Sequence, residues 1–467
     1  MEQKKHIHFI GICGVAMSAL AIAFDEQGWQ VSGSDAGFYP PVSDNLKRRG
    51  IDFYPGWHVD KMIAGGVPDL VVVGNVAGSA NPEWLYAQAQ KIAYLNYPQT
   101  IAKYFVASNS IVCAGTYGKT STSALMAWIL NEAGLNPSYM FGGLATDDNF
   151  ASARIGENKT WSVLEGDEYK SGRDDQGPKF SHYSPTHLLL TAVQWDHADI
   201  YPTEQKYLDV FSNLAGSIPL AGLAVVSENA PDEVILKFKC NLIKYGQNSG
   251  QFRYHDVTQN KNGLEFYIKA DDGDYKITTP MLGEYMAENI TGCFALAVSI
   301  GVPAQTIIDA IAKFQGIKRR LQKRGQVNGV ANGADIYDDI AHSPAKANNT
   351  LRVLRKIYSD GKIYAVFEPN TGNRQKQTAN GYDNMFQNAD EVLIPHLTKI
   401  KTDPKATNQP LQGNELAELI GRTHPIVKYF EDDQKLLDYL KQKTHSADAV
   451  VFMGSHGWRN MIEKLTQ

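Results

Sequence analysis

The sequence predicts an α/β protein of three domains. We expect a Rossmann-like domain in residues 1–107, a central α/β domain with a phosphate-binding loop and a small antiparallel sheet in residues 108–317, and a Rossmann-like α/β domain in residues 318–467. A chain of 467 residues is too long for one ordinary hydrophobic core. Strand-like apolar runs alternate with helix-length segments, as in parallel sheets. Two of these runs end in glycine-rich turns, which are typical of nucleotide-binding α/β folds.

The first domain begins with a strand–turn–helix–strand pattern. The strand-like run His6–Ile10 leads into a turn that contains Gly11 and Gly14, and the second predicted strand ends at Ser34 and Asp35. A dinucleotide-binding fold places an acidic residue at this point to bind a ribose. The third glycine of G-x-G-x-x-G is absent, so we predict a nucleotide-binding domain without a standard NAD site. The alternative is a structural turn beside an unrelated surface aspartate.

The central domain opens with the most informative motif of the chain. An apolar run at 111–113 is followed by Ala-Gly-Thr-Tyr-Gly-Lys-Thr-Ser at 114–121 and by a helical pattern that stops at Gly134. In this layout backbone N–H groups and the helix N-terminus face phosphates, the lysine reaches the terminal phosphates, and a hydroxyl ligates Mg²⁺. The general pattern expects glycine where this chain has Cys113. The alternative is a glycine-rich turn that only happens to contain Lys-Thr.

Acidic and histidine-containing segments follow the next predicted strands. An acidic cluster that begins with Glu165 follows the apolar run 162–164, and Asp196-His197 follows the run 187–192. Carboxylates at strand ends beside a phosphate loop are placed to hold Mg²⁺, directly or through water. The histidine could ligate a second metal or orient a carboxylate. The alternatives are a solvated acidic loop and a structural histidine.

The rest of the chain divides into a meander and a second α/β segment. Alternating short strands with Asn-Gly and Asp-Gly turns at 249–279 predict an antiparallel meander. The third domain follows a basic cluster with Arg319 and Arg320, which could clamp phosphate or form a basic linker. Asp338 and His342 follow a predicted strand and, like His197, could ligate a metal ion or orient a carboxylate, or could be structural. Its predicted strands lie near 335–337, 363–366, 391–394, 426–429 and 449–453.

Composition narrows the classes of function. Hydrophobic residues make up 43% of the chain and charged residues 20%, as in globular proteins. The net charge of −5 gives no general affinity for polyanions, which argues against nucleic acid as a partner. Without a run of about twenty apolar residues we expect no membrane span. The start of the chain lacks a signal-peptide core and the four cysteines lack metal-type spacing, so we expect reduced thiols in a cytoplasmic enzyme.

Taken together, these segments resemble the Mur ligases, ATP-dependent enzymes that build or recycle the peptide stem of peptidoglycan. The family pattern G-T-x-G-K-T-[ST] matches residues 115–121, and this shorter signature does not require glycine in place of Cys113. The similarity extends along essentially the whole chain. The other matching segments are 11–14, 33–35, 39–43, 165–169, 179–185, 196–202, 316–321, 324–328, 337–344, 368–369 and 462–465.

The resemblance implies how the substrates are bound. Gly11, Gly14, Ser34 and Asp35 would lie near the diphosphate and ribose of a UDP-sugar. Lys119 would contact the β- and γ-phosphates of ATP. The further implied contacts with ATP are Gly115, Thr116, Gly118, Thr120, Ser121, Asn289, Arg319, Arg320, Asp338 and His342.

The resemblance also implies two Mg²⁺ sites and a catalytic set. Thr120 and Glu165 would ligate the Mg²⁺ that ATP shares, and His197 would serve a second metal ion. Lys119, Glu165 and His197 would then be the catalytic residues. Further, the resemblance implies a monomer or a weak homodimer.

The implied reaction forms an amide bond. The lactyl carboxylate of UDP-N-acetylmuramate would attack the γ-phosphate, and an amine would then displace phosphate from the acyl phosphate. The chain is most similar to the branch that adds the peptide L-alanyl-γ-D-glutamyl-meso-diaminopimelate, and next to the branch that adds L-alanine. Two further alternatives are a nucleotide-binding protein without ligase activity and an NAD-dependent dehydrogenase. The dehydrogenase leaves the phosphate loop unexplained.

Several positions depart from the pattern of the peptide-adding branch, among them Gly166 in place of alanine and the segment 454–460, which follows the branch only loosely. Tyr117 stands where histidine is usual, and Ala192 and Gly292 replace asparagines. Ser343 replaces a histidine, and Asn370 replaces an arginine. The departures at Ser343, Asn370 and 454–460 affect the third domain, so the identity of the incoming amine is the point that the sequence leaves open.

Overall fold

The structure is a computed structural model that describes residues 4–38, 42–173, 175–196, 200–329, 333–398 and 410–467. Its contacts group into two compact units, which we describe separately. The first unit comprises residues 1–257, 265–280 and 285–316. The second unit comprises Thr258–Leu264, Met281–Glu284 and Ile317–Gln467.

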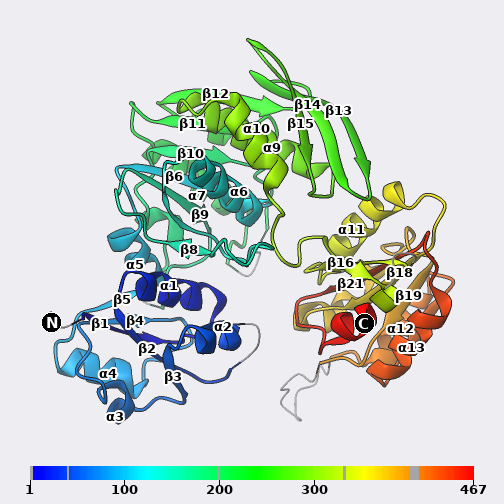
Figure 1. Cartoon of the computed structure of the whole chain (residues 1–467), viewed down its shortest axis with the longest axis horizontal. Helices are drawn as coiled ribbons and strands as arrows, with labels where there is room; N and C mark the ends of the chain where they lie inside the picture. Colours follow the sequence, from blue (N-terminus) through cyan, green and yellow to red (C-terminus); the bar gives the residue numbers. More distant parts are fainter. Residues whose placement is uncertain (1–3, 39–41, 174, 197–199, 330–332, 399–409) are drawn as a thin grey trace. The chain divides into compact units, whose positions relative to one another are not determined.

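The first unit begins with a five-stranded parallel sheet of order β3-β2-β1-β4-β5 (Figure 1). All residues of the central strand β1 are buried, as expected when helices cover both faces of a parallel sheet. The predicted strand–turn–helix–strand start is confirmed. The strands are β1 (His6–Ile10), β2 (Gln30–Asp35), β3 (Asp52–Pro55), β4 (Leu70–Val73) and β5 (Tyr94–Asn96). The helices are α1 (Val15–Glu26), α2 (Val42–Arg48), α3 (Val59–Met62), α4 (Pro82–Ala89) and α5 (Tyr97–Tyr104).

A ten-stranded sheet of order β15-β14-β13-β12-β11-β10-β6-β9-β7-β8 follows. Its parallel part contains β6 (Asn109–Ala114), β7 (Ser138–Met140), β9 (Trp161–Gly166), β10 (His187–Leu190), β11 (Leu223–Ser227) and β12 (Asn241–Gly246), with the short antiparallel β8 (Ala153–Arg154) at one edge. The predicted meander forms β13 (Phe252–Asn260), β14 (Gly263–Ala270) and β15 (Gly273–Thr279). It extends the same sheet, because β12 and β13 pair in parallel.

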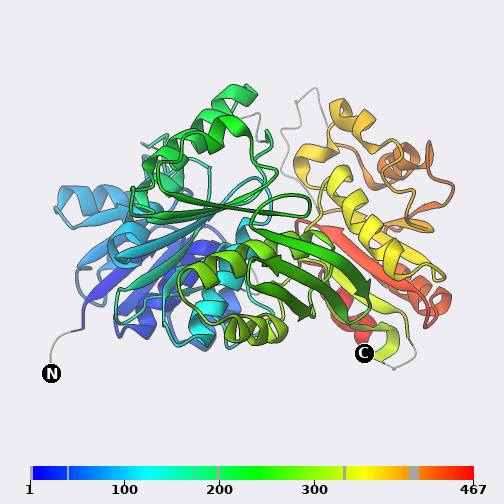
Figure 2. The ribbon, with the colours of Figure 1, turned by 90° about the horizontal axis from the view of Figure 1, so that it is seen from above.

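Helices of the central region cover this sheet. Helices α6, α9 and α10 pack against one another (Figure 2). Helix α7 packs against α8. The helices are α6 (Lys119–Glu132), α7 (Glu204–Ser217), α8 (Asp232–Ile235), α9 (Tyr285–Ser299) and α10 (Ala304–Lys313), and the 3-10 turn η1 spans Lys179–His182.

The second unit contains a six-stranded sheet of order β16-β17-β21-β18-β19-β20. The five predicted strands are present, and the sequence did not reveal the antiparallel edge strand β16. Its charged and polar sequence, QKRGQ, lacks an apolar pattern. The strands are β16 (Gln322–Gln326), β17 (Asp335–Asp339), β18 (Ile363–Glu368), β19 (Glu391–Ile394), β20 (Val427–Tyr429) and β21 (Ala449–Gly454).

Alternate residues of these strands enter two different hydrophobic clusters. Val451 belongs to one cluster, and its neighbours Val450 and Phe452 belong to the other. Both faces of the sheet are therefore covered. The helices are α11 (Pro344–Ile357), α12 (Gly413–Gly421), α13 (Asp433–Lys443) and α14 (Met461–Thr466), with 3-10 turns η2 (Val327–Gly329), η3 (Thr371–Arg374) and η4 (Lys376–Tyr382).

Two segments that precede residue 317 also belong to the second unit. Leu282 is part of the same hydrophobic cluster as Leu351 of α11. At the turn between β13 and β14, the Lys261 ammonium lies 4.6 Å from the centre of the Tyr358 ring. Glu284 forms an ion pair of 2.7 Å with Lys356. Within the described part of the chain, no helix has the length and apolar character needed to cross a bilayer.

Candidate active site

The phosphate loop connects β6 to α6. Gly115 and Gly118 have φ of +132° and +80°, a region that favours glycine. A Cβ atom on Gly118 would lie only 2.6 Å from Oδ1 of Asn289, so the side chain of this α9 residue lies directly against the loop. Gly118 is the N-cap of α6 and offers no side-chain cap to its first N–H groups. An anion can therefore bind there.

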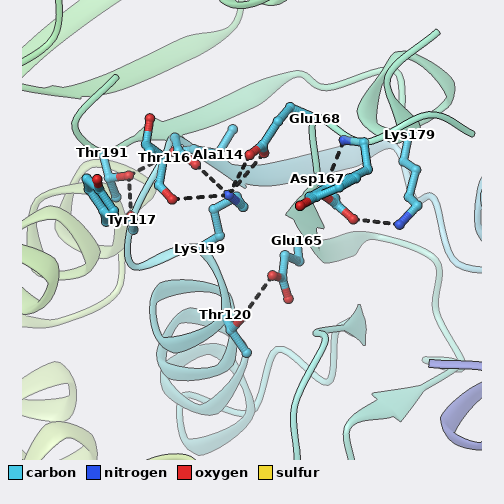
Figure 3. Close-up of polar contacts among 12 residues, drawn as sticks. Ala114, Thr116, Tyr117, Lys119, Thr120, Glu165, Asp167, Glu168, Lys179 and Thr191 are labelled. Carbon is cyan, nitrogen blue, oxygen red and sulfur yellow. Dashed lines mark hydrogen bonds and ion pairs between the residues drawn. The ribbon is translucent and has the colours of Figure 1, made fainter. Parts of the chain in front are cut away.

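The side chain of Lys119 points back over the loop (Figure 3). Its Nζ donates to the carbonyl of Gly115 at 2.8 Å and to that of Thr116 at 3.3 Å. It also lies 3.1 and 3.0 Å from the two carboxylate oxygens of Glu168. Burial raises the pKa of Glu168, and Lys119 opposes that shift. A buried carboxylate thus holds the lysine at the loop.

Thr120 and Glu165 lie together beside this pair (Figure 3). The Thr120 hydroxyl donates to Oε1 of Glu165 at 2.8 Å, and the N–H of Gly142 donates to Oε2 at 2.5 Å. A hydroxyl and a carboxylate fit Mg²⁺, which binds one or two protein oxygens and keeps water and phosphate in its other positions. Among the described residues there is no group of three or more His, Cys, Asp and Glu side chains that could hold a metal ion.

Three more residues of the central region were candidates for the site. Asp167, a member of the acidic cluster that begins with Glu165, forms an ion pair of 2.6 Å with Lys179. The Ser121 residue lies in the first turn of α6, directly after Thr120. His197, the predicted ligand of a second metal ion, lies outside the described residues.

The structure brings the predicted UDP-sugar residues together at the start of α1. The N–H groups of Gly11 and Ile12 donate to the Ser34 carbonyl at 2.7 and 3.1 Å. The N–H of Cys13 donates to Oδ2 of Asp35 at 2.8 Å, and Gly14 is the N-cap of α1. The end of β2 therefore fixes the first glycine-rich turn.

A buried polar network supports this turn, and no sequence motif predicted it. Glu83 at the start of α4 accepts hydrogen bonds from the Ser34 hydroxyl at 2.5 Å and from the hydroxyl of Tyr54 at 2.7 Å. His8 lies 3.5 Å from the same carboxylate, and neither side chain is exposed. Burial alone would raise the pKa of Glu83, but the neighbouring His8 ring and the hydrogen bonds from Ser34 and Tyr54 outweigh burial and lower the pKa.

In the second unit, the adjacent arginines Arg319 and Arg320 differ in their contacts. Arg319 Nε donates to Asp338 at 3.2 Å. Its other nitrogens donate to the carbonyl of Gly454, the last residue of β21, at 2.5 Å and to those of Ser455 and His456 in the following turn at 3.2 and 2.8 Å. Within the described ranges, the Arg320 side chain forms no hydrogen bond or ion pair. Of the two, only Arg320 has a guanidinium group that is open to a ligand.

Asp338 and His342 flank these arginines at the end of β17. Asp338 also accepts from Arg324 at 3.1 Å and from Trp458 at 3.2 Å. His342 Nδ1 lies 2.7 Å from the Ile340 carbonyl, and burial lowers the pKa of its ring. Burial also raises the pKa of the neighbouring Asp339 to about 6.

The predicted ATP contacts thus fall in two groups. Gly115 to Ser121 and Asn289 gather in the first unit, whereas Arg319, Arg320, Asp338 and His342 gather in the second. The first group can bind a nucleoside triphosphate with Mg²⁺, because it combines a lysine, a helix N-terminus, a hydroxyl and a carboxylate.

Comparisons with known proteins match the chain along almost its whole length. Three family models match in sequence order: the Mur ligase family catalytic domain at residues 6–108, the Mur ligase middle domain at 113–297, and the Mur ligase glutamate ligase domain at 319–456. A UDP-N-acetylmuramate–L-alanyl-γ-D-glutamyl-meso-2,6-diaminoheptandioate ligase of Haemophilus influenzae is 28% identical over 99% of this chain and 98% of its own.

Two further relatives represent both branches of the predicted resemblance. A UDP-N-acetylmuramate–L-alanine ligase of Clostridium acetobutylicum is 27% identical, over 97% of this chain and 95% of its own. The crystal structure of a murein peptide ligase from Psychrobacter arcticus has a TM-score of 0.68 and 26% identity, and covers 99% of this chain and 98% of its own. The chain therefore belongs to the Mur ligase family of ATP-dependent enzymes that form carbon–nitrogen bonds.

Proposed function

We propose that the protein joins the lactyl carboxylate of UDP-N-acetylmuramate to the amine of L-alanyl-γ-D-glutamyl-meso-diaminopimelate at the expense of ATP, as in peptidoglycan recycling. The observation that carries this proposal is the pairing of Lys119 with Glu168 beside the pair of Thr120 and Glu165. The full-length similarity to relatives named for this reaction supports the choice of substrates. We expect a cytoplasmic enzyme.

The residues of the first unit suit the activation step. A carboxylate is unreactive toward amines until it becomes an acyl phosphate. Lys119 would leave part of its contact with Glu168 to bind the terminal phosphates, where it stabilises charge on the transferred group. Thr120 and Glu165 would hold Mg²⁺, which supplies further neutralisation of the phosphates and orients them for in-line transfer.

The first glycine-rich turn would hold the UDP-sugar. Gly11 and Gly14 let the chain approach a diphosphate closely, and Ser34 and Asp35 fix the turn from the end of β2. In the second unit, Arg320 would bind phosphate and His342 would face the adenosine. We expect one Mg²⁺ at Thr120 and Glu165, a second served by His197, and a monomer or weak homodimer.

Addition of L-alanine is the second candidate, because relatives named for that reaction match the chain over a similar length. The two candidate reactions differ in the amine that attacks the acyl phosphate. Incubation with UDP-N-acetylmuramate, ATP and Mg²⁺, and with either the tripeptide or L-alanine, should release phosphate with the tripeptide alone. Release with L-alanine alone would refute the peptide assignment. Release with neither would favour a nucleotide-binding protein without ligase activity.

Substitutions of the two adjacent arginines should have different effects, one on activity and the other on stability. Arg320→Ala is expected to lower kcat by about 10²-fold or more while the folding midpoint in urea stays unchanged, because its guanidinium group is open to phosphate. Arg319→Ala removes four hydrogen bonds, so we expect a loss of about 2–4 kcal/mol in unfolding free energy. Urea unfolding and phosphate release measured on both variants test this. A stable, inactive Arg319→Ala variant would reverse the assignment.

A further inference from the structure

Three loops meet at the carboxyl ends of neighbouring strands. Strands β10, β6 and β9 are adjacent in the sheet, and their carboxyl ends lie at one edge because the strands are parallel. The phosphate loop follows β6, the segment with Glu168 follows β9, and the segment with Gln194 and Trp195 follows β10. Their relative positions decide where Lys119 points.

The first connection joins the phosphate loop to the segment after β10. The Thr116 hydroxyl donates to the Gln194 carbonyl at 2.7 Å and accepts from the Gln194 N–H at 2.8 Å. The same hydroxyl lies 3.0 Å from the hydroxyl of Tyr207, a fully buried residue of α7. These contacts fix the middle of the phosphate loop.

Tyr201 connects the segment after β10 to the segment after β9. Its ring packs edge-on against Tyr207, with ring centres 5.3 Å apart. Its hydroxyl donates to the backbone carbonyl of Glu168 at 2.5 Å, and its own carbonyl accepts from the indole N–H of Trp195 at 2.9 Å. Burial raises the pKa of Tyr201 to about 12, so the hydroxyl stays a donor throughout the neutral range.

We propose that Tyr201 is a positioning residue of the nucleotide site: its hydroxyl fixes the backbone of Glu168, whose carboxylate holds Lys119 over the phosphate loop. Thr116, Tyr207, Tyr201, Glu168 and Lys119 then form a continuous chain of contacts that leaves the loop and returns to it. Loss of the Tyr201 hydroxyl frees Glu168 to move, and the position of Lys119 moves with it. The proposal rests on the proposed function, because it assumes that Lys119 binds nucleotide phosphates.

The test compares the full-length wild-type protein with Tyr201→Phe, which removes only the hydroxyl. We expect the Kd for ADP, measured by titration calorimetry with Mg²⁺ present, to rise about fivefold, the effect of one lost hydrogen bond. The matched control is Tyr364→Phe, which removes a hydroxyl that donates to the Lys443 carbonyl at 3.1 Å in the second unit. It should lower the melting temperature to a similar extent without any change in the Kd for ADP.

One further variant tests the same connection. Trp195→Phe removes the donor to the Tyr201 carbonyl and should weaken ADP binding in the same direction, by about twofold to fivefold. It also keeps the proposal testable if Tyr201→Phe folds poorly. Unchanged ADP binding in both variants, with a lowered melting temperature, would show that Tyr201 only stabilises the fold.

The assay distinguishes this proposal from the proposed function. ADP binding requires neither the UDP-sugar nor an amine. If wild-type protein binds ADP but releases no phosphate with either amine, the proposed function fails and the comparison with Tyr201→Phe still stands. If wild-type protein binds no ADP, both are overturned.

Discussion

Lys119→Ala is expected to lower the rate of phosphate release by about 10³-fold, because the variant loses the cation that stabilises charge on the transferred phosphoryl group. Its Nζ lies within 3.3 Å of two loop carbonyls and of the buried Glu168 carboxylate. No other lysine is bonded to this loop among the described residues. The measurement is phosphate release with UDP-N-acetylmuramate, ATP and the tripeptide. Activity within tenfold of wild type would contradict the assignment of the loop.

Matched variants separate lost chemistry from lost stability. Lys119→Ala leaves the Glu168 carboxylate buried without its cation, which alone should destabilise the protein by about 1–3 kcal/mol. The double variant with Glu168→Gln removes the buried charge and should recover part of that stability without recovering activity. Lys206→Ala changes an exposed lysine of α7 and should leave activity unchanged.

Glu83→Ala is expected to lower the free energy of unfolding by about 2–4 kcal/mol, because buried hydrogen-bond donors lose a carboxylate acceptor. The Glu83 carboxylate is fully buried and pairs with His8, Ser34 and Tyr54. Its loss leaves the Ser34 hydroxyl and the backbone N–H of His58 without the acceptor that they have in the wild type. Urea unfolding at neutral pH measures the effect, and Glu157→Ala, at an exposed position, serves as the control. A loss below about 1 kcal/mol would mean that solvent replaces the network.

The effect of Glu83→Ala should depend on pH. Hydrogen bonds lower the pKa of Glu83 in the folded protein below its ordinary value of 4.5. Its contribution is therefore fully present above the pKa of the unfolded chain and is lost as the pH falls through the lower pKa of the folded state. The difference between wild type and variant should shrink in acid, and a difference that grows there would contradict the network.

The parts of the site that could be predicted from the sequence are formed mainly by residues close together along the chain. A strand, a glycine-rich turn, Lys-Thr and a helix follow one another within 109–132, so the turn between β6 and α6 is specified by neighbouring residues. The Thr120–Glu165 pair was predictable for a related reason. Glu165 lies at the carboxyl end of β9, and Thr120 lies in the first turn of α6, directly after the loop at the carboxyl end of the neighbouring parallel strand β6.

The parts that could not be predicted depend on contacts between distant segments. The Glu83 network joins β1, β2, β3 and α4, and no sequence pattern pairs a histidine with a glutamate so far along the chain. The different contacts of the Arg319 and Arg320 side chains also depend on tertiary structure. Arg319 has φ of +61° and Leu321 has φ of +48°, so the backbone turns sharply between them and directs the two guanidinium groups differently.

The turn between β13 and β14 has a consequence for how the chain can be divided. The polypeptide passes between the two units five times, at 257/258, 264/265, 280/281, 284/285 and 316/317. A fragment that begins at residue 318 would lack Leu282, a buried member of the hydrophobic cluster around α11, and Lys261, which covers the Tyr358 ring. The C-terminal unit is therefore not a contiguous stretch of sequence, and we expect a fragment that includes residues 258–284 to be more stable than one that begins at residue 318.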